Sequence, residues 1–588
     1  MISTGSQINN RHGITVVIGL LFAAHVFVIF APSIPLLNSE ITGSEEKDVT
    51  CTIWLDWILT NKILQGELSS QSDYIDYPQG ISIFDYYQFS ANPFFLLGLF
   101  LNPVLAHNLM MMLTVFAAGF CGYLWSFQLT GLRFESVMAG LVFSYNHVLL
   151  FSIWWGQPDG AAIYLIPLFF LLLMKTISTI KIRWAAVTGI FLAFIAYQNG
   201  YYMYLCLITL LIFTVYRLIK VRREKKRVYR HILLVVLCVT VFAVLHLPRY
   251  LVFSPHKGLS IEFQNEAATP KANKFPPGFD VGRNLDLSSI FNPFHQTRND
   301  LDNFSSEATV YFGLLFLAVS LFGFKADIRL KRFWLWVAFI CFLISLGQYL
   351  SFGQKPIPIF EKWYLPGLNA ILNHILPFFS LMNHPYRFIV GTGTCLAVFY
   401  AAGLKKIAQL AGTKSSFGRM GISATVTLLV ILELKLATPA LFPVTTFSKN
   451  IPLLMKELGK TGGEAVMILP QSQLSWSRSN AKVLDNYHLY TQAVVHERKI
   501  ARPVEPTVLK PLSDSQLQEK SQRFEKLGIR SVLYIPDFSS WSGHLSQYKD
   551  YPLDKLSGDS FRDNFRKLGW IVLEKEHVFL ARMKEQLK

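Results

Sequence analysis

Apolar residues in this chain of 588 residues gather in blocks of about twenty, separated by shorter polar segments. A helix needs about that length to cross the hydrocarbon core of a bilayer. The pattern predicts a mostly α-helical, polytopic transmembrane bundle of about eleven spans. They lie at about residues 14–31, 104–129, 134–154, 161–174, 185–197, 201–216, 231–247, 310–324, 333–350, 388–404 and 421–441.

Two long polar segments, residues 38–92 and 249–307, interrupt this pattern, and no apolar block follows residue 443. The tail instead has an amphipathic helical pattern at 514–527 and short strand-like runs. These runs are residues 465–469, 531–535, 570–573 and 578–581. We therefore predict a transmembrane domain at 1–443 and a small α/β domain at 444–588, which should be soluble when expressed alone.

Composition supports a membrane protein, since 52% of residues are hydrophobic and only 16% are charged, against about 25% charged in soluble proteins. The net charge of +17 could suit nucleic acid. However, Lys and Arg cluster in five alternate short loops, the pattern of cytoplasmic loops. We expect no nucleic-acid partner, a cytoplasmic N-terminus and an outer C-terminal domain. The loops carry Arg133, Lys175–Arg183, Arg217–Arg227, Lys325–Arg332 and Lys405–Arg419.

The first polar segment opens with four acidic residues, Glu40, Glu45, Glu46 and Asp48. Carboxylates there could act as a base, hold a metal ion, or simply keep the segment in water. An amphipathic helix with two tryptophans is predicted at 52–64, either lying in the outer membrane interface or packing on the bundle. The following Tyr77-Pro-Gln79-Gly indicates a turn.

Further candidates lie near the predicted ends of spans. Asn146 and His147 end the third span, and a histidine there is either functional or held by a structural hydrogen bond. Arg387, with His384 just before it, could grip a phosphate through its guanidinium fork or extend to lipid headgroups. Gln157 and Arg249 lie in polar connections. No nucleotide-binding, zinc-protease or nucleophile-elbow motif appears in a suitable context, which argues against ATP-driven and dehydrogenase chemistry.

The order of these features resembles the GT-C class of membrane glycosyltransferases, and most of all its YfhO-like and related uncharacterised bacterial branches. The resemblance covers about residues 10–440. The pieces that carry it are the acidic start and tryptophan-bearing helix of the first polar segment, Tyr77–Gly80, Asn92-Pro93, Gly131–Arg133, Ala139–Ser144, Tyr311–Leu315 and Leu376–Phe388.

The resemblance implies transfer of a sugar from a polyprenyl phosphate to a glycan or lipid acceptor at the outer face of the bacterial cytoplasmic membrane. Glu45 or Asp48 would be the base or would bind a divalent metal ion such as Mg²⁺ or Mn²⁺. Glu46 and Glu40 are the next candidates for these roles. The class usually has a Gly-Asp pair where this chain reads Gly43-Ser-Glu45-Glu46, so the identity of the base stays open. The implied substrate-binding residues are Arg387, His384, Tyr77, Gln79, Asn146, His147, Gln157 and Arg249.

Two other functions fit the sequence. A transporter or flippase would need polar groups inside the membrane, for which Glu433, Lys435 and Gln198-Asn199-Gly200 are the candidates. A non-catalytic scaffold that presents the C-terminal domain would tolerate neutral residues in place of the acidic ones.

Overall fold

The structure is a computed structural model. It describes residues 4–44, 49–67, 71–77, 81–82, 92–219, 221–252, 284–291, 310–353, 355–360, 363–376, 379, 384–413, 415–438, 441–448, 453–458, 465–469, 492–497, 499–501, 512–526, 529–534, 555–568, 570–575 and 578–582. The chain divides into two compact units. Unit 1 contains residues 1–35, 110–256 and 268–445, and unit 2 contains residues 36–109, 257–267 and 446–588.

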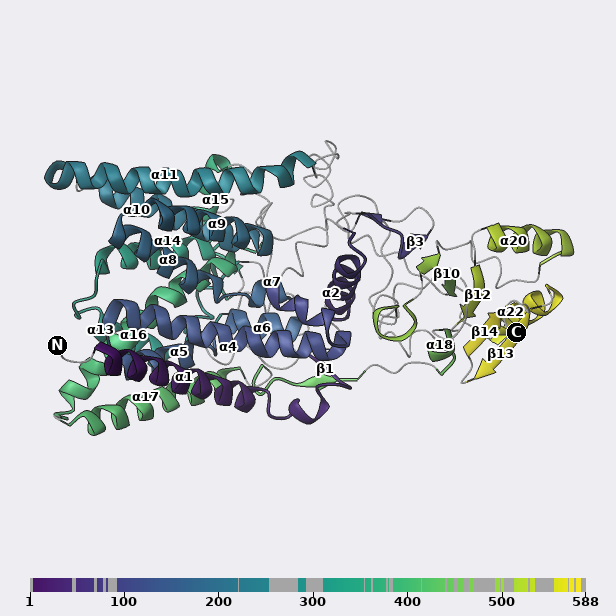
Figure 1. The fold of residues 1–588 in the computed structure, drawn as a ribbon, viewed down its shortest axis with the longest axis horizontal. Coiled ribbons are helices and arrows are strands. Elements are labelled where there is room, and N and C mark those ends of the chain that lie inside the picture. The colour runs from purple at the N-terminus through teal and green to yellow at the C-terminus, as the bar shows by residue number, and fades with distance from the viewer. Residues whose placement is uncertain are drawn as a thin grey trace. The chain divides into compact units, whose positions relative to one another are not determined.

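Unit 1 is a bundle of helices, and each of the eleven predicted spans contains a helix (Figure 1). The innermost helix is α16 (Ile389–Leu410), which packs against α5, α13 and α14 and is buried along most of its length. The other helices of the bundle are α1 (Thr4–Ile29), α4 (Pro103–Thr130, which begins in unit 2), α5 (Arg133–Phe143), α6 (His147–Trp155), α7 (Pro158–Ala161), α8 (Leu165–Thr179), α9 (Ile182–Gln198), α10 (Gly200–Ile219), α11 (Val221–Val252), α13 (Leu314–Gly323), α14 (Lys331–Ser345) and α17 (Ser416–Ala437).

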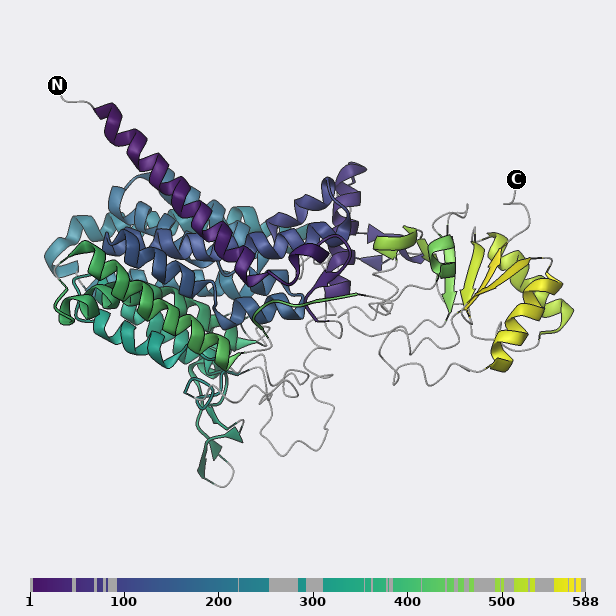
Figure 2. The same cartoon turned by 90° about the horizontal axis from the view of Figure 1, so that it is seen from below.

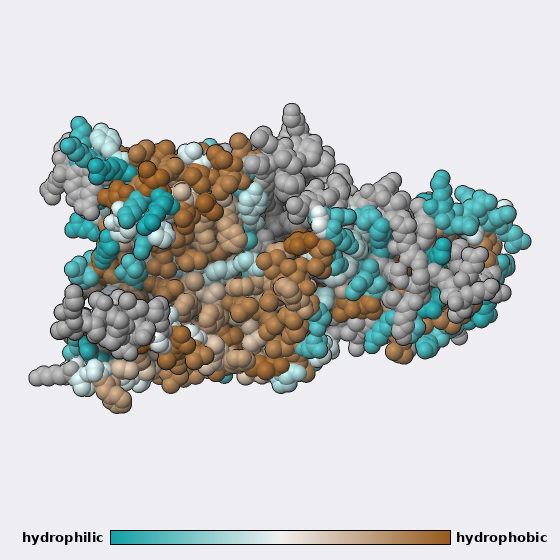
Figure 3. All heavy atoms as spheres, viewed as in Figure 1, coloured by the Kyte–Doolittle hydropathy of each residue, from teal (hydrophilic) through white to brown (hydrophobic). Residues whose placement is uncertain are grey.

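Six segments among the described residues are helices long and apolar enough to cross a membrane. They are residues 103–130, 133–155, 200–219, 228–247, 385–410 and 416–437, and shorter apolar helices lie at 13–29, 165–179, 182–198 and 314–323. Apolar side chains cover the outward faces of these helices, whereas hydrophilic ones gather at the bundle end near the N-terminus (Figure 3). Because water would not favour such a surface, the predicted polytopic membrane fold is confirmed.

The predicted third span is broken into α5 and α6 at residues 144–146. The side chain of Asn146 accepts a hydrogen bond from the Val148 amide at 2.9 Å and so caps α6. Helix α6 then ends at Gly156, whose φ of +80° favours glycine. A short connection that contains α7 joins α6 to α8. Polar residues of this connection therefore lie between two apolar helices in the chain.

Unit 2 contains a six-stranded mixed sheet in the order β13-β14-β12-β10-β11-β3. Its strands from the tail are β10 (Ala465–Leu469), β11 (Lys499–Ala501), β12 (Ile529–Tyr534), β13 (Ile571–Lys575) and β14 (Val578–Arg582). The helices α18 (Leu453–Leu458), α20 (Asp514–Lys526) and α22 (Lys555–Lys567) accompany them. The four predicted strand-like runs and the predicted amphipathic helix are all present.

The first polar segment is built into this sheet. Strand β3 (Ile75–Tyr77) pairs in parallel with β11, with Ile75 opposite Ile500. Helix α2 (Val49–Leu64) buries Trp54 and Trp57 in the same hydrophobic core as Ile468. Residues 36–109, which sequence analysis assigns to the transmembrane domain, therefore fold with the tail.

A buried glutamine links the two parts of unit 2. The indole nitrogen Nε1 of Trp54 donates to Oε1 of Gln492 at 2.7 Å, and Nε2 of Gln492 donates to the Tyr74 carbonyl at 2.7 Å. The tryptophan-bearing helix therefore packs in the core of unit 2 with the tail, which neither alternative from the sequence described. The smaller elements of unit 2 are β1 (Ile41–Thr42) paired with β9 (Thr446–Phe447), β2 (Gln71–Ser72) paired with β4 (Ile81–Ser82), the 3₁₀ helix η2 (Pro93–Leu99) and the π-helix η7 (Gln492–His496).

Candidate active site

A buried ion pair in unit 1 links α7 to the 3₁₀ helix η6 (Pro385–Phe388). Nη1 of Arg387 donates to Oδ2 of Asp159 at 3.0 Å. Both residues are only 5% exposed. Taking two charges out of water is costly unless their geometry is good and other polar groups complete it.

Neighbouring side chains complete the surroundings of the guanidinium. Nη2 of Arg387 donates to Oε1 of Gln157 at 2.6 Å, and Nε donates to the Tyr386 hydroxyl at 3.4 Å. The ring of Tyr201 lies with its centroid 5.1 Å from the guanidinium carbon, within the range of a cation–π contact. The plane and direction of the guanidinium fork are therefore fixed from three sides.

The start of α10 holds the carboxylate side of the pair. Nδ2 of Asn199 donates to Oδ2 of Asp159 at 3.1 Å, while Oδ1 of Asn199 accepts from the Tyr201 amide at 2.9 Å and so caps α10. The hydroxyl of Tyr202 donates to the Gly160 carbonyl at 2.5 Å. A Cβ at Gly160 would meet Oγ of Ser152 at 2.6 Å, so a larger residue there would displace the Ser152 hydroxyl.

Burial raises the pKa of the Asp159 carboxyl, while the charge of Arg387 and a hydrogen bond from the Gly160 backbone lower it. Within the described residues, Oδ1 of Asp159 is buried without a hydrogen-bond partner. An acceptor oxygen in this position can take a proton or a donor group from a ligand.

An apolar groove of about 360 Å³ lies between α10 and α11, and it shares the first turns of α10 with the ion-pair cluster. Met203 and Tyr204 line the groove, whereas the preceding Tyr201 and Tyr202 contact the cluster. The volume falls in the usual range for small-molecule sites, about 300–1,000 Å³. The remaining lining residues are Leu207, Ile208, Leu211, Phe242, Ala243, His246, Leu247 and Leu376.

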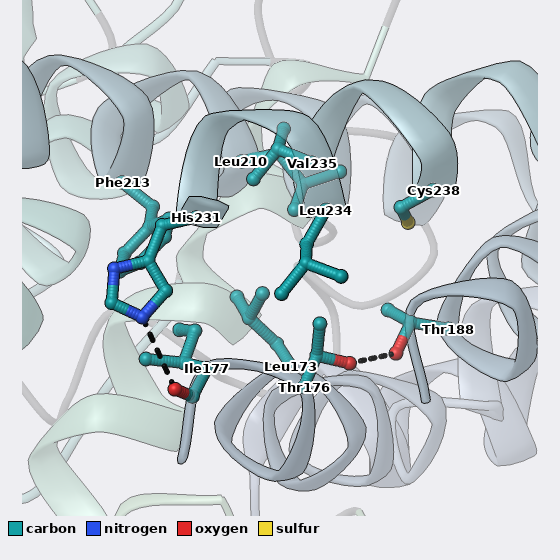
Figure 4. Close-up of a pocket in the computed structure, with 10 residues that line it drawn as sticks. All are labelled: Leu173, Thr176, Ile177, Thr188, Leu210, Phe213, His231, Leu234, Val235 and Cys238. Carbon is teal, nitrogen blue, oxygen red and sulfur yellow. Dashed lines mark hydrogen bonds between the residues drawn. The ribbon is translucent and has the colours of Figure 1, made fainter. Parts of the chain in front are cut away.

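A second cavity, between α8, α9, α10 and α11, is a packing defect rather than a substrate site (Figure 4). Its volume is about 10 Å³, room for about one water molecule. The polar groups beside it already bond within the bundle: Nε2 of His231 lies 3.2 Å from the Ile177 carbonyl, and the hydroxyls of Thr176 and Thr188 are 2.9 Å apart.

The structure brings together three of the residues that the sequence nominates, namely Gln157, His384 and Arg387. The backbone amide of His384 donates to the Tyr201 hydroxyl at 2.9 Å. The alternative in which Arg387 extends to lipid headgroups is wrong, because its side chain is buried. Sequence analysis did not nominate Asp159, and the signal that could have found it is an acidic residue in a Gly- and Pro-containing connection between two apolar helices.

The other nominated residues lie elsewhere. Asn146 caps α6, and the buried ring of His147 stacks on Phe151. Tyr77 ends β3 and Arg249 lies in α11, but their side chains are outside the described part of the chain. Glu45, Glu46, Asp48 and Gln79 also lie outside it. Within the described residues, no three His, Cys, Asp or Glu side chains form a group that could hold a metal ion.

The acidic residues of the first polar segment that the structure describes include Glu40 and Asp56. Glu40 accepts a hydrogen bond from the Thr446 hydroxyl at 2.6 Å. Asp56, on α2, is buried, and within the described residues neither of its carboxylate oxygens has a hydrogen-bond partner. Burial raises the pKa of Asp56 well above its ordinary value, so this carboxyl is suited to stay protonated in unit 2.

The fold is that of the GT-C class of membrane glycosyltransferases. Arabinofuranosyltransferase AftD from Mycobacteria is similar with a TM-score of 0.50 and 13% identity, over 89% of this chain and 37% of AftD. This chain thus spans little more than a third of AftD. The resemblance stated from sequence is confirmed at the level of the fold, and the YfhO-like branch stays a prediction.

Two other solved structures show weaker similarity. Archaeal oligosaccharyltransferase AglB from Archaeoglobus fulgidus, in complex with an inhibitory peptide and a dolichol-phosphate, gives a TM-score of 0.40 at 11% identity, over 98% of this chain and 75% of AglB. ArnT from Cupriavidus metallidurans, bound to undecaprenyl phosphate, gives 0.46 at 10% identity, over 96% of this chain and 97% of ArnT. No protein-family model matches this chain, and no curated protein sequence does.

Proposed function

We propose that this protein is a glycosyltransferase that moves a sugar from a polyprenyl-phosphate donor to a glycan or lipid acceptor. The observation that carries the proposal is the apolar groove of the membrane bundle, which begins at Met203, two residues along α10 from Tyr201, whose ring contacts the buried and oriented Arg387. A donor with a long apolar chain and an anionic phosphate needs these two features side by side. The GT-C fold supports the same reaction.

In the proposed complex, the prenyl chain occupies the groove between α10 and α11. The donor phosphate lies near Arg387, which Asp159, Gln157 and Tyr201 hold in one orientation. A guanidinium fixed in this way stabilises negative charge without reorganising during the reaction. Asp159 is thus proposed as a positioning residue, acting through Arg387.

The chemical step joins the acceptor oxygen to the anomeric carbon of the sugar. The bond between that carbon and the phosphate oxygen breaks, and its electron pair leaves with the phosphate. The acceptor hydroxyl loses its proton to a carboxylate, for which Glu45 and Asp48 remain the proposed bases, with Glu46 in reserve. A carboxylate base typically contributes about a hundred- to ten-thousand-fold in rate.

The divalent metal ion remains a proposal for Glu45 and Asp48, and no step above depends on it. Tyr77, Gln79 and Arg249 are proposed to contact the substrate, as are His384, Asn146 and His147. The proposed location is the bacterial cytoplasmic membrane, with the N-terminus inside and the tail outside. The loop charges support this orientation.

The test is transfer of radiolabelled sugar in membranes that contain wild type or single variants. Arg387→Lys should weaken donor use, because an ammonium cannot reproduce the guanidinium fork. Arg329→Lys, at an exposed arginine between α13 and α14, is the matched control and should retain activity. If the wild-type protein transfers no sugar from any polyprenyl donor but moves a solute across vesicle membranes, the protein is a transporter and this proposal is wrong.

The structure gives structural roles to the polar groups that motivate a transporter. The carboxylate of Glu433 accepts from the amides of Leu314 and Leu315, at 2.6 and 3.0 Å, and so caps α13. Lys435 lies over the ring of Phe442, with Nζ 5.3 Å from the centroid. No observation therefore favours transport over transfer.

A further inference from the structure

Two short β-hairpins and a helix form a projection between α14 and α16, which we name the hairpin platform. The first hairpin pairs β5 (Ser351–Phe352) with β6 (Lys355–Pro356), the second pairs β7 (Pro358–Phe360) with β8 (Trp363–Tyr364), and α15 (Leu368–Ile375) follows. In Figure 2 these strands, coloured teal-green, extend sideways from the bundle, away from the helix axes.

The two hairpins are bonded to each other and to a separate segment of unit 1. The Leu350 amide donates to the Leu365 carbonyl at 3.0 Å, and the Ile357 amide donates to the Leu350 carbonyl at 2.9 Å. Oδ1 of the buried Asp286 accepts from the Gly353 amide at 3.1 Å. The platform therefore has a defined shape that places its side chains.

Large apolar side chains at the tips of the hairpins face outward. Trp363 is 72% exposed, Phe360 71% and Phe352 64%. On α15, Ile371 and Ile375 are 53% and 68% exposed. Several large apolar side chains exposed on one small projection normally mark an interaction surface, and these residues contribute little to the core of unit 1.

The surface of the bundle indicates what covers this patch. Helix α15 packs on α14, and α14 exposes Trp336 and Phe339 on the membrane-spanning bundle. The platform therefore adjoins a helix that presents large apolar side chains on the outside of the bundle. The platform carries two lysines, Lys355 and Lys362, and one acidic residue, Glu361. Tryptophan and lysine are both favoured at a membrane interface.

We propose that the hairpin platform lies in the lipid interface and inserts Phe352, Phe360 and Trp363 into the leaflet at the end of the bundle where α14 ends and α16 begins. It would then fix how deep that end sits in the membrane. Arg387 begins α16 at the same end, so the platform also sets the depth of the ion-pair cluster.

The test uses the full chain in phosphatidylcholine/phosphatidylglycerol nanodiscs, with the half-buried Cys51 changed to serine. An environment-sensitive nitrobenzoxadiazole probe is attached at Trp363→Cys or, separately, at Phe360→Cys. Lipids with a spin label near the headgroup should quench either probe at least twofold more than lipids labelled deep in the acyl chain. Aqueous iodide should quench both probes weakly.

Two further positions serve as controls for the quenching measurements. Lys526→Cys, on an exposed position of α20, should respond to iodide alone, and Leu428→Cys, on the exposed face of α17, should respond to the deep spin label. Iodide quenching at 360 and 363 equal to that at 526 would overturn the proposal in favour of a water-facing surface. Quenching by neither lipid nor iodide would overturn it in favour of a protein contact, such as a second copy of the chain.

Discussion

Arg387 and Asp159 are separated by 228 positions in the chain, yet Nη1 of one lies 3.0 Å from Oδ2 of the other. Each charge is buried and depends on its partner. Removal of one partner from such a pair typically costs about 3–5 kcal/mol, because the other charge is left uncompensated.

We therefore expect Asp159→Asn to lower the thermal stability of detergent-solubilised protein markedly, and Asp159→Leu/Arg387→Met to recover much of the loss, because the double variant buries no charge. Both should lack transferase activity. Intrinsic-fluorescence melting curves measure stability, with the exposed Arg329→Met as control. Equal destabilisation by the single and double variants would contradict the pairing argument.

The acidic residues of the first polar segment give the most direct test of the chemistry. Glu45→Gln or Asp48→Asn should cut sugar transfer by about a hundred- to ten-thousand-fold. The melting temperature should change little, because the proposed role of these carboxylates is in the reaction and not in the fold. If Glu40, Glu45, Glu46 and Asp48 can all be neutralised with transfer retained, the proposed base is wrong. Dependence on added Mg²⁺ or Mn²⁺, measured in the same assay, tests the metal ion.

The buried carboxyl of Asp56 should make the stability of the protein depend on pH. Its folded pKa is raised by burial, so its contribution is fully present below the unfolded pKa of about 4 and is lost as pH rises through the folded pKa. The protein should melt at a higher temperature at pH 5 than at pH 8. Asp56→Asn removes the charge and should reduce this difference while raising stability at pH 8. The exposed Asp514→Asn is the control, and an unchanged pH difference in Asp56→Asn would count against the argument.

The architecture of unit 2 changes the expectation for the isolated tail. Residues 444–588 alone lack α2 and β3, so the core around Ile468 and Ile500 would be open to water. We now expect this fragment to aggregate and co-expression of residues 36–92 to restore solubility, which sedimentation measures. In the full chain, Trp54→Phe should cost about 1–3 kcal/mol, because Oε1 of Gln492 loses its donor. A soluble, folded 444–588 fragment would show that α2 is dispensable.

Orientation in the membrane is tested by cysteine accessibility. Single cysteines at position 224, in the basic region between the predicted sixth and seventh spans, and at position 540 in the tail should be labelled from opposite sides. Position 224 should react from the cytoplasm. Five of the six native cysteines are buried and Cys51 is half-buried, so the background should be low. Labelling of position 224 from outside and of position 540 from the cytoplasm would contradict the proposed reaction at the outer face.

The helices could be predicted from sequence because an apolar block of bilayer length has few alternatives to a helix. The same holds for the tail strands, where local runs such as 465–469 are apolar throughout. The break at Asn146 was missed, since hydropathy averaged over a span does not register one capping side chain.

The features that could not be predicted from the sequence depend on contacts between residues far apart in the chain. Strand β3 has only three residues and is defined by its pairing with β11, more than 400 positions away. Asp159 looked like an ordinary loop residue because nothing near it in sequence shows that Arg387 neutralises it. The amphipathic pattern of α2 showed that it had an apolar face but not whether lipid or protein would cover it.

The division of the sheet of unit 2 between the first polar segment and the tail affects how the protein is made. Strand β3 ends at Tyr77, whereas the tail strands begin beyond Thr446. At about 5–20 residues per second, a ribosome needs tens of seconds to cover that interval. During this time the buried faces of Trp54 and Trp57 have no tail to pack against. The nascent chain must therefore keep α2 and β3 from aggregating, by a chaperone or by temporary contact with membrane lipid, until synthesis is nearly complete.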